Sequence, residues 1–78
     1  MNRDEVLLFV YNKKVKRTGK VYTIWDPVMG NIPVSSYIAF FIAEEWMDSN
    51  LVLSKEGKQA VAEAMKRRMD AQKSVRSV

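Results

Sequence analysis

The sequence predicts a small α+β domain, in which a three-stranded antiparallel sheet is followed by two helices packed on one of its faces, in the order β-β-β-α-α. Three observations support this prediction. The first third of the chain is rich in β-branched and aromatic residues, residues 26–31 carry a strong turn signal, and the second half shows helical periodicity with capping residues. With 78 residues, the chain is long enough for a single domain spanning residues 1–78.

The first predicted strand covers residues 5–11, a continuous apolar run. Runs of this kind are typical of buried strands when β-branched and aromatic residues dominate them. A helix from Asp4 to Arg17, closed by Gly19, is the alternative. Residues 13–20 are polar and include a glycine, so we expect them to form a loop or the end of a hairpin.

Residues 21–25 form the clearest predicted strand, because all five residue types favour β structure. Residues 26–31 follow as a turn. Pro27 fixes the φ angle of the first central turn position, and Gly30 tolerates a positive φ. A short return strand is expected at 32–34, and its proline places it at an edge of the sheet.

The first predicted helix runs from Tyr37 to Ser49, after an N-cap at Ser35 or Ser36. Its early turns are apolar on nearly all sides, so one side packs on the sheet and the other needs a second neighbour. That neighbour is either the second helix or another subunit, which would make the protein a homodimer through residues 37–49.

The second predicted helix runs from Lys55 to Lys73, with Ser54 as its N-cap, and residues 74–78 are expected to fray. Its apolar stripe ends near Met65, because Arg68 falls on the centre of the same stripe. We therefore expect the last two turns to project beyond the core as a basic arm. An Arg68 side chain buried against an acid of the first helix would contradict this.

Charge is segregated along the chain. Residues 21–54 contain four acids and no Lys or Arg (−4), whereas the flanks contain all 13 basic residues and the other five acids (+8). The acids Glu44, Glu45 and Asp48 end the first predicted helix, where the helix dipole disfavours them. We expect neutralisation inside the fold or by solvent, and a basic patch on a protein partner is the alternative.

Basic side chains on a hairpin and along a helix neutralise nucleic-acid phosphates, and Tyr11, Tyr22 and Trp25 on nearby strands are suited to stacking on bases. The alternative is a solvated basic surface that keeps a small protein soluble. The candidate nucleic-acid-binding residues are Lys13, Lys14, Lys16, Arg17, Lys20, Lys66, Arg67, Arg68 and Lys73.

The sequence contains no His and no Cys. A disulfide and a metal site built on thiolate or imidazole are therefore excluded, and no nucleophile–base constellation can be assembled. We expect a non-enzyme without metal or cofactor. The longest apolar run, residues 37–43, is far shorter than the roughly 20 residues of a membrane span, so a soluble, cytoplasmic protein is expected.

Residues 19–46 loosely resemble the arm-type DNA-binding domains of phage integrases, over about a third of the chain. The matching stretch is Lys-Val-Tyr-Thr-Ile-Trp-Asp-Pro-Val-Met-Gly-Asn at residues 20–31. Those domains have a basic stretch, a strand, an Asp-Pro-x-x-Gly turn, a return strand and a helix. The resemblance implies a three-stranded sheet followed by a helix. Here the return strand lacks the usual basic residues, and the helix ends in acids.

The favoured interpretation is a small non-catalytic binding protein, of the kind that phages and mobile elements encode. It would bind nucleic acid through basic clusters at residues 13–20 and 66–76. The alternative is an inhibitor or adaptor module that occupies a host or partner protein, and a structural subunit of a larger assembly is a third possibility. The candidate protein-contact residues are Trp25, Met29, Trp46 and Met47.

The position of the aromatic residues distinguishes the first two interpretations. Exposed Tyr22 and Trp25 beside residues 13–20 would favour nucleic acid. An exposed apolar patch around Met29 and Trp46 would favour a protein partner.

Overall fold

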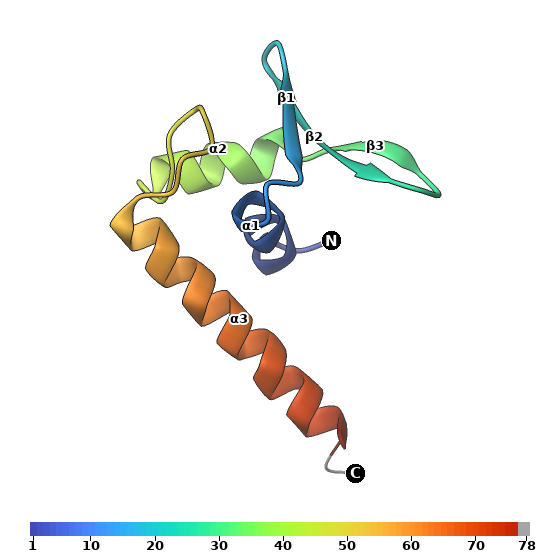
Figure 1. The fold of residues 1–78 in the computed structure, drawn as a ribbon, viewed down its shortest axis with the longest axis vertical. Coiled ribbons are helices and arrows are strands. Elements are labelled where there is room, and N and C mark those ends of the chain that lie inside the picture. The colour runs from blue at the N-terminus through green and yellow to red at the C-terminus, as the bar shows by residue number, and fades with distance from the viewer. Residues whose placement is uncertain (77–78) are drawn as a thin grey trace.

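The computed structural model describes the backbone of residues 1–76 and the side chains of residues 1–71. The elements, in chain order, are α1 (Arg3–Tyr11), β1 (Val15–Thr18), β2 (Val21–Asp26), β3 (Gly30–Pro33), α2 (Ser35–Ala43) and α3 (Lys55–Arg76) (Figure 1). The three strands form one antiparallel sheet in the order β1-β2-β3. The predicted α+β fold, with this sheet followed by two helices, is confirmed, and an additional helix precedes the sheet.

That additional helix, α1, occupies the segment for which a strand was predicted at 5–11, so this part of the prediction is wrong. Asn2 caps α1, because its side-chain oxygen accepts a hydrogen bond from the backbone N–H of Glu5 (N···O 2.9 Å). Asp4 and Glu5 also place negative charge in the first turn, where the helix dipole favours it. The apolar run is buried on most of its sides, because α1 packs against α3 and contributes to the core.

The helix ends at Tyr11, well before the Arg17 of the helical alternative. Lys13 adopts a left-handed backbone conformation (φ 58°). The backbone N–H groups of Lys13 and Lys14 donate hydrogen bonds to the carbonyl oxygens of Val10 and Phe9. This pair of bonds is a Schellman motif, in which glycine is the usual residue because others cost about 1 kcal/mol in that conformation.

Helix α2 begins slightly earlier and ends earlier than predicted. Its N-cap is Val34 rather than a serine, since the Ser35 hydroxyl oxygen accepts a hydrogen bond from the backbone N–H of Tyr22 in β2 (2.9 Å). The helix ends at Ala43 because Glu45 adopts φ 61° and forms a second glycine-free Schellman motif. Residues 44–54 therefore form a loop, and the predicted end at Ser49 is wrong.

The basic segment 13–20, which was expected to be a loop or hairpin end, supplies an edge strand and a tight turn. Gly19 and Lys20 connect β1 to β2, and Gly19 has the positive φ (63°) that the first central position of such hairpins favours. The turn between β2 and β3 is the predicted one. There, a carboxylate oxygen of Asp26 accepts hydrogen bonds from the N–H groups of Val28 and Met29 (2.8 and 2.9 Å).

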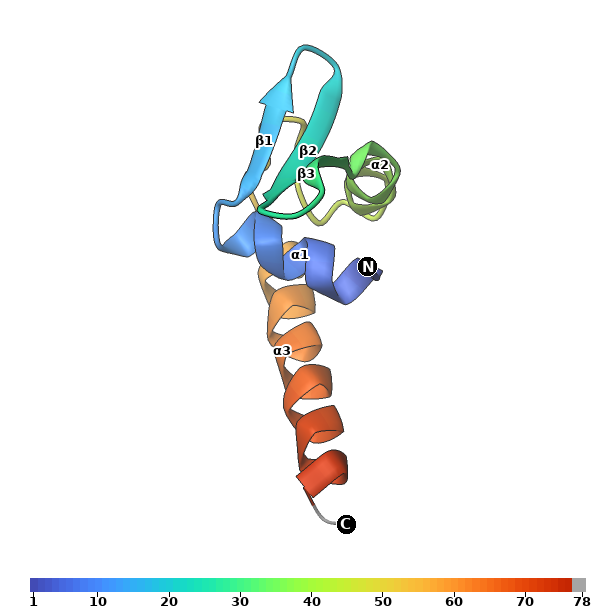
Figure 2. The ribbon, with the colours of Figure 1, turned by 90° about the vertical axis from the view of Figure 1, so that its right-hand side faces the viewer.

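Helix α3 begins as predicted, with the Ser54 hydroxyl oxygen accepting a hydrogen bond from the N–H of Gly57 (3.1 Å). It is described to Arg76, past the predicted end at Lys73, and residues 77–78 of the expected frayed tail lie outside the described residues. Figures 1 and 2 show its last turns extending away from the other elements. Side chains 65–71 are all exposed, as expected for a projecting arm.

The hydrophobic core lies between the sheet, α1, α2 and the first turns of α3. Loop 44–54 lies against the same side of the sheet, where the Tyr22 hydroxyl donates a hydrogen bond to the carbonyl oxygen of Ser49 (2.6 Å). The most deeply buried large side chains are Phe41, Leu7, Ile38, Val6 and Val34. Among the described helices and loops, none covers the other side of the sheet (Figures 1 and 2).

Candidate functional site

The sheet has two faces of opposite character. Tyr22 and Ile24 of β2 point into the core, and the strand register places the alternate residues on the opposite, outer face. This outer face carries no acid. It is formed by Lys16, Thr18, Val21, Thr23, Trp25, Asn31 and Pro33.

Trp25 is the largest side chain of the outer face and is 67% exposed. Lys16 of β1 is paired with Thr23, which makes it a diagonal neighbour of Trp25 across the strands. Diagonal neighbours are within reach when the side chains are long or aromatic. The outer face therefore combines an exposed aromatic ring with a cation. In proteins that bind single strands, the ring stacks on a base and the cation contacts the phosphate.

Tyr22 and Arg17 do not contribute to this surface, although the sequence suggested both. The ring of Tyr22 is buried, and the Arg17 guanidinium carbon lies 5.9 Å from its centroid. The Arg17 side chain donates hydrogen bonds to the carbonyl oxygens of Gly19 (3.1 Å) and Ser49 (3.3 Å). Both residues therefore hold loop 44–54 against the sheet. The remaining basic residues of the segment, Lys13, Lys14 and Lys20, are exposed around the hairpin.

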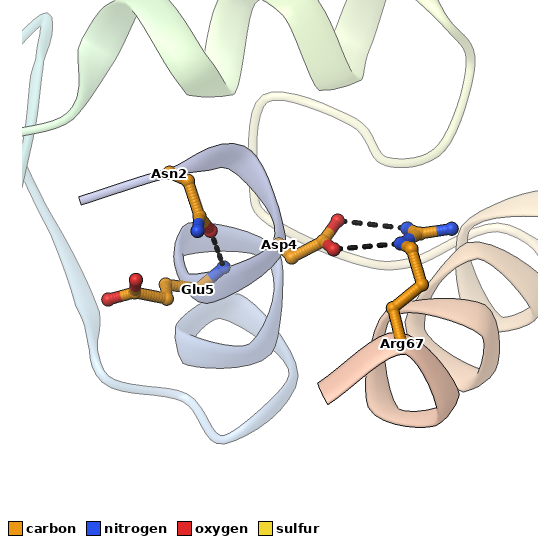
Figure 3. Close-up of polar contacts among 4 residues, drawn as sticks. All are labelled: Asn2, Asp4, Glu5 and Arg67. Atoms are coloured by element: carbon orange, nitrogen blue, oxygen red, sulfur yellow. Dashed lines mark hydrogen bonds and ion pairs between the residues drawn. The ribbon is translucent and has the colours of Figure 1, made fainter. Parts of the chain in front are cut away.

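The second basic cluster lies on the projecting part of α3, where Lys66, Arg67 and Arg68 are exposed. Arg67 is bound to the first turn of α1, because its Nε and Nη2 donate to the two carboxylate oxygens of Asp4 at 2.8 and 2.9 Å (Figure 3). The side chain of Lys73 lies outside the described side chains.

The Asp4–Arg67 pair shifts both ionisations. The hydrogen bond from Arg67 lowers the pKa of Asp4 below its ordinary value, partly opposed by burial and assisted by the positive charges of Arg67 and Arg3. The same bond raises the pKa of Arg67. The arm is thus joined to α1 by a bidentate ion pair. Among the described side chains of the arm, those of Lys66 and Arg68 are the basic ones that remain available to a ligand.

The far ends of the two basic clusters, at the β1–β2 turn and at the last turns of α3, lie at opposite ends of the long axis of the molecule, along which it extends 46 Å. The β1–β2 turn points to one end and the C-terminal half of α3 to the other (Figures 1 and 2). They do not form one continuous patch. A ligand that meets both must be extended.

The four candidate protein-contact residues are divided between surface and core. Met29 is 75% exposed in the turn of the β2–β3 hairpin, four residues after Trp25. Trp46 is half-buried and stacks on Phe41 (centroids 5.7 Å apart), and Met47 lies in the core. Val28, between Pro27 and Met29, is 90% exposed, and no pattern in the sequence distinguishes it as a surface residue.

The acids that follow α2, Glu44, Glu45 and Asp48, are exposed. Within the described side chains the ion pair is that of Asp4 with Arg67, so these three acids are neutralised by solvent rather than by the basic clusters. Asp26 has a lowered pKa because the N–H groups of Met29 and then Val28 donate to its carboxylate. The charged carboxylate of Asp26 therefore stabilises the β2–β3 turn.

Among the described residues, no helix combines the length and the apolar character required to cross a bilayer, and no three potential metal ligands gather in one place. No protein-family model, curated protein or solved structure matches the chain. The geometry and charge of the surface are therefore the basis for a functional proposal.

Proposed function

We propose that this chain is a non-catalytic protein that binds nucleic acid, with bases stacking on the outer face of the sheet. The observation that carries the proposal is the exposed ring of Trp25 on an acid-free face that it shares with Lys16. A tryptophan with most of its surface in water is unusual unless it contacts something, and a base offers both a flat face and a nearby phosphate.

The geometry favours a single strand over a duplex. Bases must be unpaired to stack on a side chain of a sheet, and such stacking contributes about 1–3 kcal/mol per base without selecting sequence. Lys13, Lys14 and Lys20 surround the hairpin and would follow the phosphates of such a strand. Lys66 and Arg68 would meet a strand long enough to reach the arm. The absence of His and Cys supports binding without catalysis.

Tryptophan fluorescence provides a direct test. The chain has two tryptophans, and a Trp46→Phe variant leaves Trp25 as the reporter on the outer face. We expect single-stranded DNA or RNA to quench this fluorescence at low salt, with duplex DNA binding more weakly. The affinity should fall steeply as salt rises, since phosphate contacts release counterions. A signal that single-stranded oligonucleotides leave unchanged at low salt would refute the proposal.

Point variants separate stacking from charge. Trp25→Ala, followed by anisotropy of a labelled oligonucleotide, should weaken binding by about 1–3 kcal/mol with the salt dependence unchanged. Lys16→Ala should reduce the salt dependence by about one phosphate contact. Lys55→Ala, on α3 and away from the outer face, is the matched control and should bind as the wild type does. Equal effects of Lys16→Ala and Lys55→Ala would show that net charge alone governs binding.

A protein partner is the second candidate, favoured by the exposed side chains of Val28 and Met29 in the β2–β3 turn and of Trp25 in the preceding strand. Large apolar side chains gathered on a protruding turn are typical of contacts that insert into a partner's pocket. A photo-crosslinking residue at position 28 tests this directly. A single host protein captured at position 28, and lost in a Met29→Asp variant, would support this function over nucleic-acid binding.

A further inference from the structure

Two grooves of opposite charge lie on either side of residues 52–53. The first, of about 570 Å³, contains Lys13 and Lys58 over an apolar floor. The second, of about 590 Å³, contains Glu45 and Asp48. Val52 and Leu53 line both. We call these the basic groove and the acidic groove.

Each groove carries one sign of charge. No acid lines the basic groove and no Lys or Arg lines the acidic groove. The four charged side chains are exposed, and none of them takes part in an ion pair with the described side chains. The two halves of this surface are therefore complementary to each other in charge, but they lie side by side and cannot meet within one chain.

The segment between the grooves is held in place. The backbone N–H of Asp48 donates to the carbonyl oxygen of Val52, and a carboxylate oxygen of Asp48 accepts the N–H of Val52 in return (both 3.1 Å). Met47 and Leu53 form a β-bridge beneath them. Val52 is 62% exposed at the centre of this closed loop. An apolar side chain fixed outward by its own backbone is organised for a contact before the contact forms.

Backbone conformation provides a second observation. Lys13 and Glu45 are the left-handed residues that end α1 and α2, where glycine would be more stable. Each of them contributes a charge to one of the two grooves. Strain of this kind is concentrated where a side chain is needed for contacts.

We propose that a second copy of the chain covers this surface, related by a two-fold axis that passes close to Val52. A two-fold interface brings the same patch of both subunits together, so each residue must find its complement on the same surface. Two adjoining grooves of opposite charge meet this condition. The basic groove of each subunit faces the acidic groove of the other, and the two Val52 side chains meet at the centre.

This dimer differs from the one that the sequence suggested through residues 37–49. Helix α2 contributes the exposed side chain of Ile42 to the edge of the acidic groove. The rest of the surface comes from loop 44–54 and from the basic groove. Trp25 and Lys16 line neither groove, and of the residues proposed to contact nucleic acid only Lys13 lines one, so the dimer leaves the outer face of the sheet open.

Charge reversal combined with mixing tests the proposal. Sedimentation equilibrium of the wild type, over a concentration series reaching millimolar, should show a monomer–dimer equilibrium. Glu45→Lys and Lys58→Glu should each weaken the dimer about tenfold or more, because the symmetry places two repelling pairs in each homodimer. An equimolar mixture of the two variants should dimerise again, since both pairs between unlike chains are then attractive.

Matched controls separate this interface from effects of net charge. Glu44→Lys and Lys55→Glu change the same charges outside both grooves and should leave the dimer unchanged. Glu45→Gly should raise the melting temperature and yet weaken the dimer, which a purely structural role of Glu45 would not produce. A wild type that stays monomeric throughout the series, or a mixture that stays as monomeric as its components, would overturn the proposal.

Discussion

Gly57 is the residue at which a single methyl group should be most damaging. It lies in the first turn of α3, where the helix crosses the chain at Trp46. A Cβ added to Gly57 would lie 1.8 Å from the carbonyl oxygen of Trp46 and 2.8 Å from its carbonyl carbon. Real Cβ contacts keep at least 3.0 Å, so the two segments would have to separate by about 1.2 Å (3.0 − 1.8).

The separation would disturb the hydrogen bonds that join the two segments. The backbone N–H of Ser54 donates a hydrogen bond to the carbonyl oxygen of Trp46 (2.9 Å). The Ser54 hydroxyl donates one to the carbonyl oxygen of Glu45 (2.6 Å). Weakening them costs about 1 kcal/mol each, and overpacking against backbone adds about 1–3 kcal/mol. Alanine returns about 1 kcal/mol through its helix propensity. We expect Gly57→Ala to lower the free energy of unfolding by about 2–4 kcal/mol.

Urea and thermal unfolding followed by circular dichroism measure this loss, which corresponds to roughly 10–30 °C in melting temperature for a chain of this size. Ala62→Gly, at an exposed position further along α3, is the control and should cost about 1 kcal/mol through propensity alone. A Gly57→Ala variant as stable as the wild type, or more stable, would refute the close packing of α3 on Trp46.

Three further substitutions test the ion pair, the loop and a helix end. Because the pKa of Asp4 is lowered on folding, its contribution to stability is complete above its ordinary value of 3.8 and is lost as the pH falls through the lower folded value. Asp4→Asn should therefore be less stable at pH 7 and indistinguishable in strong acid; a difference constant with pH in thermal melts would contradict this. Tyr22→Phe should lower the free energy of urea unfolding by about 1 kcal/mol, through loss of the hydrogen bond to Ser49, and an unchanged midpoint would show that the bond contributes nothing. Lys13→Gly should raise the melting temperature by the equivalent of about 1 kcal/mol, and a lower one would show that the Lys13 side chain stabilises the monomer.

The sequence predicted β2, β3 and α3 because their signals are local. Asp26, Pro27 and Gly30 specify the second hairpin, and Ser54 caps α3. The ends of α1 and α2 were not predicted correctly, because the left-handed residues that end them are Lys13 and Glu45, and neither residue type is typical of a helix end. The strand predicted at residues 5–11 failed because a helix buried on most sides has no alternation or amphipathic stripe to reveal it.

The candidate surface was only partly accessible to sequence reasoning. Alternation along β2 correctly placed Trp25 and Tyr22 on different faces, but which face is buried depends on α1, α2 and loop 44–54. Arg17 and Arg67 were grouped with the other basic residues, although hydrogen bonds to Ser49 and Asp4 give them a structural part. Their partners are more than thirty residues away in the chain, so no local pattern indicates them.

A three-stranded sheet exposes two edges, and both edges of this one discourage the addition of a foreign strand. β1 carries Lys16 and Arg17 among its four residues, and β3 is equally short and ends in Pro33, which has no N–H to offer. The basic residues of β1 therefore disfavour edge-to-edge aggregation of the folded protein. Replacing them by neutral residues should increase the rate of aggregation in a concentrated solution. Light scattering should therefore accompany every binding measurement on a β1 variant.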